Sequence, residues 1–236
     1  MDGQVETVLN VCVLYPELLG TYGDGGNGLV LAERARRRGV EATLTLVGLR
    51  DEVPAADVYL LGGGEDGPQR LACDLLADSS FVERVRGGAH VVAVCAGLQI
   101  LGTAFCVEGD DEYAGLDLVD VVTVRGEQRS VGELVVSVGG QMLVGFENHG
   151  GRTTLADGVE PLGTVVRGRA NDGLVDGYRA PRIWATYAHG PVLAMNPWLA
   201  DEILGAVLQR ALEPLDSAAD LLYAERRRVL KVGSAG

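Results

Sequence analysis

A cysteine that directly follows an apolar segment is the clearest sign of chemistry in this sequence. Residues 90–102 read HVVAVCAGLQILG, which predicts a buried strand that runs into Cys95 and a helix that begins at once. Such a strand, turn and helix form a nucleophile elbow. Ala93, Ala96 and Gly97 are small enough for a tight turn, and the positive end of the helix favours a thiolate. Strand cysteines are more often buried core residues, so the assignment of Cys95 as nucleophile depends on its surroundings.

Three consecutive glycines provide part of those surroundings. Residues 60–66 read LLGGGED, a predicted strand that ends in glycines whose bare backbone can approach a ligand and direct N–H groups at it. Together with the N–H of Ala96, this loop would stabilise the negative oxygen that forms when a thiolate adds to an amide carbonyl. Three glycines alone are more often only a turn.

One of the three histidines is placed to exchange protons with Cys95. Residues 185–197 read ATYAHGPVLAMNP, which predicts a strand that ends just before His189. Histidine exchanges protons near neutral pH, as a cysteine nucleophile requires. His90 begins the nucleophile strand and His149 lies in a glycine-rich loop. His189 is preferred because open parallel sheets bind ligands at the carboxyl edge of their strands.

Strands and helices alternate around these residues. Strands are predicted at residues 8–14, 42–47, 58–61, 91–94 and 183–187, and helices at residues 29–38, 69–76, 97–105, 197–212 and 216–232. This alternation is typical of a parallel sheet with helices on both faces. Residues 116–124, 133–138 and 142–146 are β-rich, with a Gly139-Gly140 turn, and predict antiparallel additions. We expect one α/β domain over residues 1–236.

Composition excludes several classes of protein. The chain has 236 residues, 47% of them hydrophobic, which is enough for one large core. Its net charge of −13 disfavours nucleic acid and anionic membrane surfaces as partners. No apolar run approaches the roughly 20 residues of a membrane span, and residues 1–6 lack the features of a signal peptide, so we expect a cytoplasmic protein. The four cysteines show no spacing typical of a zinc site or of a disulfide framework: Cys12, Cys73, Cys95 and Cys106. No metal or other cofactor is indicated.

Several segments together resemble class I glutamine amidotransferases, in particular the CobB/CobQ-like branch, which includes the GatD-type glutaminase subunits. They are YPELLGTYGDGGN (15–27), LGGGEDGPQ (61–69), CAGLQ (95–99), RSVGEL (129–134), GFENHGGRT (145–153) and TYAHGPVLAMNP (186–197). The resemblance extends over nearly the whole chain. CAGLQ alone marks only an amidotransferase, whereas the first segment, ENHGGR and HGP are specific to this branch.

The resemblance implies a flavodoxin-like domain that hydrolyses glutamine. Cys95 would attack the side-chain amide to form a glutamyl thioester, ammonia would leave, and water would regenerate the enzyme, with His189 as base and acid. It also implies four residues that contact the substrate: Gly63 and Ala96 as oxyanion donors, Arg129 as ligand of a glutamine carboxylate, and Gln99 as part of the pocket wall. A guanidinium pairs with a carboxylate through two hydrogen bonds, although by residue type Arg129 is equally well an exposed turn arginine.

Two positions depart from the family pattern. Ala93 replaces the first glycine of the usual elbow and is small enough to preserve the turn. The usual triad also has a glutamate two residues after the histidine, where this chain has Pro191. We therefore predict that a partner protein supplies the carboxylate that orients His189, and that the isolated chain is a poor glutaminase. Three acidic residues of this chain are alternatives: Asp24, Glu147 and Asp176.

The resemblance further implies a two-protein synthetase. The partner would be a Mur-ligase-like (MurT-type) subunit that uses ATP to activate the D-glutamate of the lipid II stem, in a heterodimer with this chain. No GxxxxGK[ST] loop for ATP occurs in the sequence. One alternative is the amidotransferase component of cobyrinate or cobyrate amidation, which usually includes an ATPase domain. Another is a non-catalytic regulatory subunit, which the presence of both Cys95 and His189 disfavours.

Overall fold

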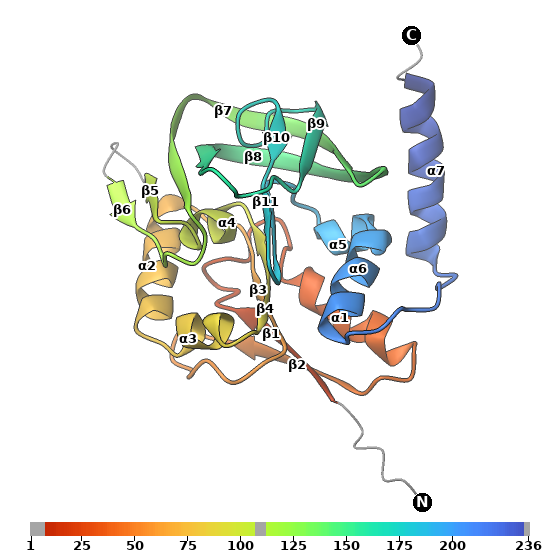
Figure 1. The fold of residues 1–236 in the computed structure, drawn as a ribbon, viewed down its shortest axis with the longest axis horizontal. Coiled ribbons are helices and arrows are strands. Elements are labelled where there is room, and N and C mark those ends of the chain that lie inside the picture. Colours follow the sequence, from red (N-terminus) through yellow and green to blue (C-terminus); the bar gives the residue numbers. More distant parts are fainter. Residues whose placement is uncertain (1–7, 107–111, 234–236) are drawn as a thin grey trace, which may run out of the picture.

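A mainly parallel sheet forms the centre of the computed structural model, which describes residues 8–106 and 112–233 (Figure 1). Residues 1–6, on which the signal-peptide argument rests, lie outside this part. The strand order is β11-β12-β4-β3-β1-β2. These strands are β1 (Leu9–Leu14), β2 (Ala42–Val47), β3 (Val58–Leu61), β4 (His90–Val94), β11 (Tyr178–Ala180) and β12 (Ile183–Thr186). Only β11 pairs antiparallel in this sheet, so the predicted α/β architecture is confirmed.

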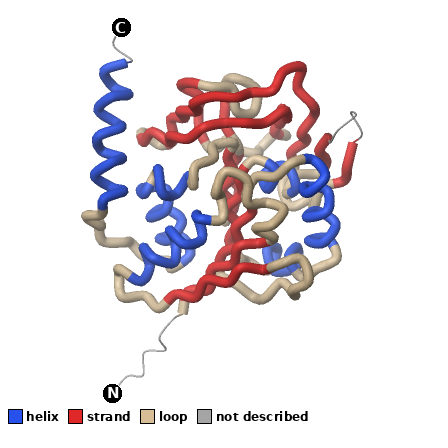
Figure 2. The backbone as a smooth tube through the Cα atoms, turned by 180° about the vertical axis from the view of Figure 1, so that it is seen from behind, coloured by secondary structure: helices blue, strands red, loops and turns tan. Residues whose placement is uncertain are grey.

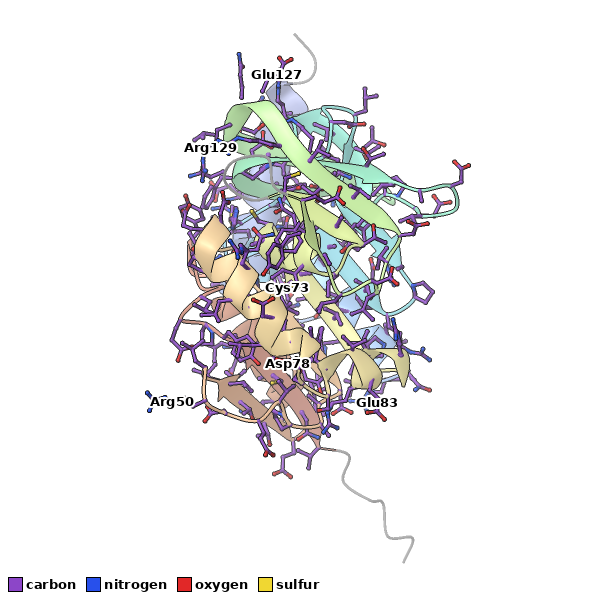
Figure 3. The ribbon with its side chains drawn as sticks, turned by 90° about the vertical axis from the view of Figure 1, so that its left-hand side faces the viewer. Arg50, Cys73, Asp78, Glu83, Glu127 and Arg129 are labelled. Atoms are coloured by element: carbon purple, nitrogen blue, oxygen red, sulfur yellow. The ribbon has the colours of Figure 1, made fainter. Side chains whose placement is uncertain are left out.

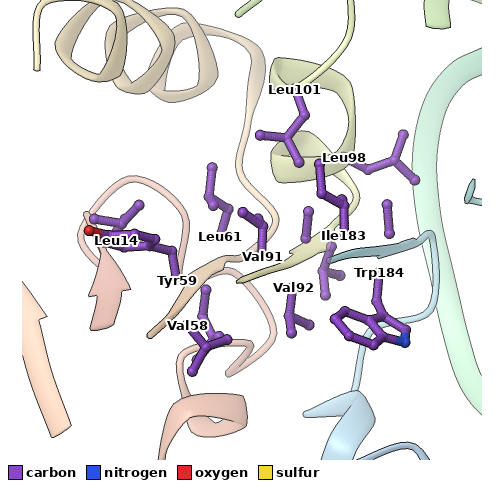
Figure 4. Close-up of a cluster of buried hydrophobic side chains, with 14 of the residues drawn as sticks. Leu14, Val58, Tyr59, Leu61, Val91, Val92, Leu98, Leu101, Ile183 and Trp184 are labelled. Carbon is purple, nitrogen blue, oxygen red and sulfur yellow. The ribbon is translucent and has the colours of Figure 1, made fainter. Parts of the chain in front are cut away.

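Helices cover both faces of this sheet (Figures 1 and 2). One layer consists of α1 (Gly26–Arg36), α5 (Val192–Met195) and α6 (Pro197–Val207), and the other of α2 (Asp66–Ala77), α3 (Phe81–Arg86) and α4 (Ala96–Ile100). Every residue of β3 and β4 is buried, which explains why these strands are almost wholly apolar. Figure 4 shows their side chains packed between Leu98 and Leu101 of the α4 segment and Trp184 of β12.

A second sheet lies across one end of the first (Figure 1). Its order is β10-β9-β7-β5-β6, and β8 also pairs with β7. The strands are β5 (Ala104–Cys106), β6 (Glu112–Ala114), β7 (Val121–Val138), β8 (Gln141–Leu155), β9 (Gly163–Arg167) and β10 (Val175–Asp176). Both residues of the predicted Gly139-Gly140 turn have positive φ, 54° and 82°, as the tight hairpin between β7 and β8 requires. This sheet contains the expected antiparallel additions.

The carboxyl-terminal helix α7 (Ala218–Gly233) extends beyond the body of the molecule (Figures 1 and 2). Tyr223 attaches it to β8, because its hydroxyl donates a hydrogen bond to the carbonyl of Met142 at 2.7 Å. Among the helices that the structure describes, none is both long and apolar enough to span a bilayer.

The structure corrects two predicted elements. The helix expected over residues 97–105 ends at Ile100, and β5 follows it. Here pairing overrides helix propensity, because the N–H of Thr103 donates to the carbonyl of Val121 at 2.9 Å. The β-rich segment 116–124 is a strand only from Val121, since residues 116–119 donate their N–H groups to the carbonyls of residues 100–102, where α4 ends. Helix α3 is absent from the predicted elements.

Candidate active site

Cys95 occupies the sharp turn between β4 and α4. Its backbone has φ 51° and ψ −105°, a region that residues with a Cβ rarely adopt. Gly97, the second residue of α4, needs to be glycine, because a Cβ there would lie 2.6 Å from the Cβ of Leu61. Cys95 is 6% exposed and lines a pocket. The strand, strained turn and helix expected of a nucleophile elbow are thus all present.

His189 follows β12 and is almost fully buried, at 1% exposure. Its Nδ1 atom lies 2.8 Å from Oδ2 of Asp24. Phe146 stacks against the imidazole with ring centroids 5.4 Å apart, and Tyr22 meets it edge-on at 4.9 Å. Gly63 closes another side, because a Cβ at this position would lie 2.5 Å from Cε1 of the ring. The imidazole is therefore held by packing on its faces and edges and by the hydrogen bond at Nδ1.

Asp24 provides the carboxylate that the residues after His189 do not. It is 2% exposed, and its Oδ2 atom accepts both the imidazole hydrogen bond and the N–H of Gly63 at 3.0 Å. The chain thus holds its own carboxylate at Nδ1, which corrects the expectation that a partner protein supplies it. Glu147 and Asp176, the other two alternatives, hydrogen-bond other groups.

The charge state of His189 suits an acid and base. Burial lowers the pKa of the imidazole, but the hydrogen bond that it donates to Asp24 and the neighbouring Cys95 raise it more, to about 9. A positive imidazolium is therefore favoured at neutral pH. Its Nε2 atom is buried and has no hydrogen-bond partner in the described part of the chain. Because Nδ1 is engaged by Asp24, Nε2 is the nitrogen available to Cys95 and to a leaving group.

The two expected oxyanion donors, Gly63 and Ala96, differ in what their N–H groups contact. The N–H of Gly63 donates to Asp24, so it is not directed at a substrate oxygen. Gly64 lines the same pocket as Cys95. Within residues 8–106 and 112–233, the N–H groups of Gly64 and Ala96 have no acceptor, whereas the N–H of Gly97 donates to the carbonyl of Gly62 at 3.1 Å. Within the described residues, the N–H groups of Gly64 and Ala96, and not that of Gly63, are therefore the ones left to face a substrate oxygen.

A pocket of about 210 Å³ opens beside Cys95, and Gln99 and Arg129 both line it. The side-chain amide of Gln99 donates to the hydroxyl of Tyr187 at 3.1 Å and accepts from Gln69 at 2.9 Å. Arg129 extends from β7 at the same end of the molecule as Glu127 (Figure 3). Glu65, Asp66, Arg125 and Glu127 add charges of both signs to the wall. Such a wall suits a zwitterionic amino acid.

Two residues near the site were not identified from the sequence. Tyr22 packs on His189 and accepts a hydrogen bond from the amide of Asn148, whose Oδ1 atom accepts one from Nε of Arg129 at 2.5 Å. This chain of contacts joins Arg129, at the pocket wall, to the imidazole of His189. Both residues lie in segments that carry the family resemblance, residues 15–27 and 145–153. This resemblance is the signal in the sequence that could have identified them.

Comparison with known proteins agrees with this geometry. Residues 10–197 match the model of the CobB/CobQ-like glutamine amidotransferase domain. The chain belongs to this family. It is therefore a glutamine amidotransferase, and the predicted family and enzyme class are confirmed.

Three of the curated proteins that are similar to this chain match most of its length. The GatD subunit of lipid II isoglutaminyl synthase (glutamine-hydrolyzing) from Streptococcus pneumoniae is 32% identical over 89% of this chain and 84% of its own length. The subunit of the same name from Staphylococcus aureus is 31% identical, with 81% of each chain covered. Cobyric acid synthase from Pelotomaculum thermopropionicum is 30% identical over 89% of this chain but only 42% of its own length.

Solved structures support the fold. A crystal structure of a glutamine amidotransferase matches 84% of this chain and 98% of its own, with a TM-score of 0.57 and 22% identity. The glutaminase domain of Trypanosoma brucei CTPS with bound acivicin matches 89% of this chain, with a TM-score of 0.52 and 12% identity. These likenesses place the chain in the class I glutamine amidotransferase fold.

Proposed function

We propose that the chain hydrolyses L-glutamine to glutamate and ammonia in the cytoplasm and delivers the ammonia to a synthetase partner. The observation that carries this proposal is the contact between Asp24 and His189 beside a strained, pocket-lining Cys95. A strained nucleophile, a base and an orienting acid form the arrangement that acyl transfer requires. A non-catalytic role would leave this arrangement without a purpose.

The reaction begins with attack of the Cys95 sulfur on the side-chain carbonyl carbon of glutamine. The N–H groups of Gly64 and Ala96 stabilise the oxyanion of the tetrahedral intermediate. His189 donates its Nε2 proton to the departing nitrogen, so that ammonia leaves and a glutamyl thioester remains. The neutral imidazole then takes a proton from water, whose oxygen attacks the thioester and releases glutamate. Asp24 keeps Nδ1 protonated throughout and stabilises each imidazolium.

Recognition of glutamine depends on the charges at the pocket wall. Arg129 pairs with the α-carboxylate, and Asn148 holds its guanidinium by accepting a hydrogen bond from Nε. Gln99 lies deeper, where Gln69 and Tyr187 fix its amide, and it faces the uncharged part of the substrate. The pocket thus has a positive group at its mouth and neutral polar groups near Cys95.

The proposed partner is a Mur-ligase-like (MurT-type) subunit that activates a carboxylate with ATP, and the proposed acceptor is the D-glutamate of the peptidoglycan stem on lipid II. This part of the proposal is supported by the names of the relatives from Streptococcus pneumoniae and Staphylococcus aureus, which align over most of both chains. The chain spans less than half of the cobyric acid synthase that it matches. The proposed product is an amidated lipid II for cell wall biogenesis.

Transfer of labelled nitrogen tests this proposal. The chain is co-expressed with a Mur-ligase-like partner and supplied with ATP, lipid II and glutamine labelled with ¹⁵N in its amide. Mass spectrometry should find one labelled amide on the D-glutamate residue, and Cys95→Ala should prevent its formation from glutamine while leaving its formation from added ammonia. Amidation of cobyrinate or cobyrate in place of lipid II would refute the acceptor. Incorporation by the Cys95→Ala complex from glutamine would refute the role of this chain.

A further inference from the structure

Tyr22 is a surface residue whose ring reaches the buried imidazole of His189. Its side chain is 39% exposed, yet its ring meets that of His189 edge-on, with centroids 4.9 Å apart. It also meets the ring of Phe146 edge-on at 5.0 Å. Tyr22 therefore has one end in solvent and one side against the proposed base, and the reaction described above uses none of its atoms.

The backbone around Tyr22 holds the residue in an unusual conformation. Its φ is 62°, in a region that residues with a Cβ rarely adopt. On one side, the N–H of Thr21 donates to the carbonyl of Gly63 at 3.1 Å. On the other side, Asp24 accepts the hydrogen bond of His189 at 2.8 Å. A bulky residue that its neighbours hold in such a conformation beside an active site is a candidate for a functional role.

The hydroxyl of Tyr22 is connected to Arg129 through one amide. Nδ2 of Asn148 donates to this hydroxyl, and Oδ1 of Asn148 accepts a hydrogen bond from Nε of Arg129 at 2.5 Å. A guanidinium only donates hydrogen bonds, so the amide oxygen must face Arg129 and the NH₂ group must face Tyr22. Tyr22, Asn148 and Arg129 thus form a relay of hydrogen bonds with one possible order of donors and acceptors.

Arg129 can hold a carboxylate while it takes part in this relay. Its Nη2 atom also contacts Asn148, by donating to the backbone carbonyl at 3.4 Å. In the described part of the chain, Nη1 makes no hydrogen bond. The N–H groups at the end of a guanidinium suit the two oxygens of a carboxylate. Because Arg129 and Asn148 line the same pocket as Cys95, a substrate carboxylate at this end would be joined to the relay.

We propose that Tyr22 is a positioning residue that makes the placement of His189 depend on a carboxylate bound to Arg129. Tyr22 and Arg129 are exposed and Asn148 is half-buried, so water competes for each hydrogen bond of the relay. A carboxylate that pairs with Arg129 fixes the guanidinium, and Asn148 and Tyr22 then lose freedom in turn. The ring of Tyr22 is thereby held against His189, which keeps Nε2 directed at Cys95.

This inference rests on the proposed glutaminase function and names what the site selects. The selected substrate is a primary amide whose other end has a carboxylate, as in glutamine. An amide without that carboxylate would fit beside Cys95 but leave the relay unanchored, so its turnover would be slow. The relay would therefore limit the hydrolysis of other primary amides, and its effect would be on kcat as well as on binding.

A double-mutant cycle on kcat tests the connection. Tyr22→Phe retains the ring but removes the hydroxyl, and it should lower kcat for glutamine about fivefold. Arg129→Ala should lower kcat by a similar factor besides its larger effect on KM. In the Arg129→Ala background, Tyr22→Phe should change kcat by less than about twofold, because the relay is already broken. Tyr113→Phe, which removes a hydroxyl that contacts Asp74, is the matched control.

Two kinetic results would overturn the proposal. One is an equal fractional loss of kcat from Tyr22→Phe in both backgrounds, which a purely structural role of this tyrosine would give. The other is a wild-type kcat in Tyr22→Phe.

Fluorine NMR tests the same connection without hydrolysis. The seven tyrosines of Cys95→Ala are labelled as 3-fluorotyrosine, and Tyr22→Phe identifies the signal of Tyr22 by its loss. Saturating glutamine should shift and narrow this signal, and Asn148→Ala should remove most of that response. An unchanged signal with glutamine bound, or a full response in Asn148→Ala, overturns the proposal. Failure of glutamine to bind Cys95→Ala at all, measured by calorimetry, would refute the proposed function and this inference with it.

Discussion

Asp24 and His189 are 165 residues apart in the chain, yet their side chains meet at 2.8 Å in the buried centre of the site. The same carboxylate oxygen accepts the N–H of Gly63. Asp24 thus orients the imidazole through Nδ1 and ties the glycine loop to His189. The position of one carboxylate therefore sets both the orientation of His189, the proposed base, and the backbone that precedes Gly64, the proposed oxyanion donor.

Replacing this carboxylate by an amide should lower turnover while preserving the fold. Asp24→Asn retains the shape of the side chain but removes the charge that stabilises the imidazolium and selects its tautomer. We expect kcat to fall by as much as about 10⁴-fold, with a smaller change in KM. Steady-state glutamate release measures this, and Asp78→Asn on the exposed end of α2 is the matched control. Wild-type kcat in Asp24→Asn would show that the carboxylate is not used.

The pH dependence of turnover follows from the raised pKa of His189. Its value of about 9 means that the imidazolium is present at neutral pH and is lost as the pH rises through that value. Because the imidazolium protonates the leaving ammonia, kcat should decline over that range. Asp24 raises this pKa, so Asp24→Asn should move the decline to lower pH. A wild-type profile that stays level through pH 9, or a variant profile with an unmoved alkaline limb, would contradict this role.

Cys95 should be the sole cysteine that a substrate-like electrophile modifies. Burial raises the pKa of Cys12 to about 12 and is the main cause that raises that of Cys73 to about 11, so both thiols are inert. A glutamine-like diazo-ketone should label Cys95 alone, as peptide mapping can show. Cys95→Ala should abolish hydrolysis at a stability cost of only ~1 to 2 kcal/mol, whereas Cys12→Ala should retain activity. Label on Cys106, which also lines the pocket, would contradict the assignment.

Arg129 should affect glutamine binding more than the chemical step. Removing one member of a charge-assisted pair costs about 1.5 to 3 kcal/mol, which corresponds to a KM raised roughly 10- to 100-fold. Arg167→Ala on β9 removes an exposed arginine that pairs with Glu133 outside the pocket, and it should leave KM unchanged. Equal KM values for Arg129→Ala and the wild type would place the carboxylate site elsewhere.

Much of the fold could be predicted because local pattern and tertiary role coincide. The apolar residues that precede Cys95 form a strand buried on both faces, and the two glycines after Val138 adopt the positive φ of a hairpin. The end of the helix expected over residues 97–105 could not be predicted in this way, because the helix stops at Ile100. Its end depends on Thr103 pairing with Val121 of β7, a contact between elements that no local pattern specifies.

The site could be predicted only as far as single segments reveal it. Cys95 and His189 each stand at the end of a recognisable strand. The pairing of Asp24 with His189 depends on the loop after β1 folding over β3, where the N–H of Thr21 bonds to the carbonyl of Gly63 at 3.1 Å. The sequence likewise does not reveal which of the three glycine N–H groups Asp24 accepts. In the structure it is that of Gly63.

Glutamine turnover by the isolated chain is the most direct test of the central claim that Cys95, His189 and Asp24 form a complete site within this chain. Purified protein is incubated with glutamine, without partner or ATP, and glutamate and ammonia are measured together. The account predicts equal molar release of both products, none from Cys95→Ala, and a severe loss in Asp24→Asn. Release no higher than that of Cys95→Ala, followed by activation when a partner is added, would contradict it and show that the chain needs a group from outside.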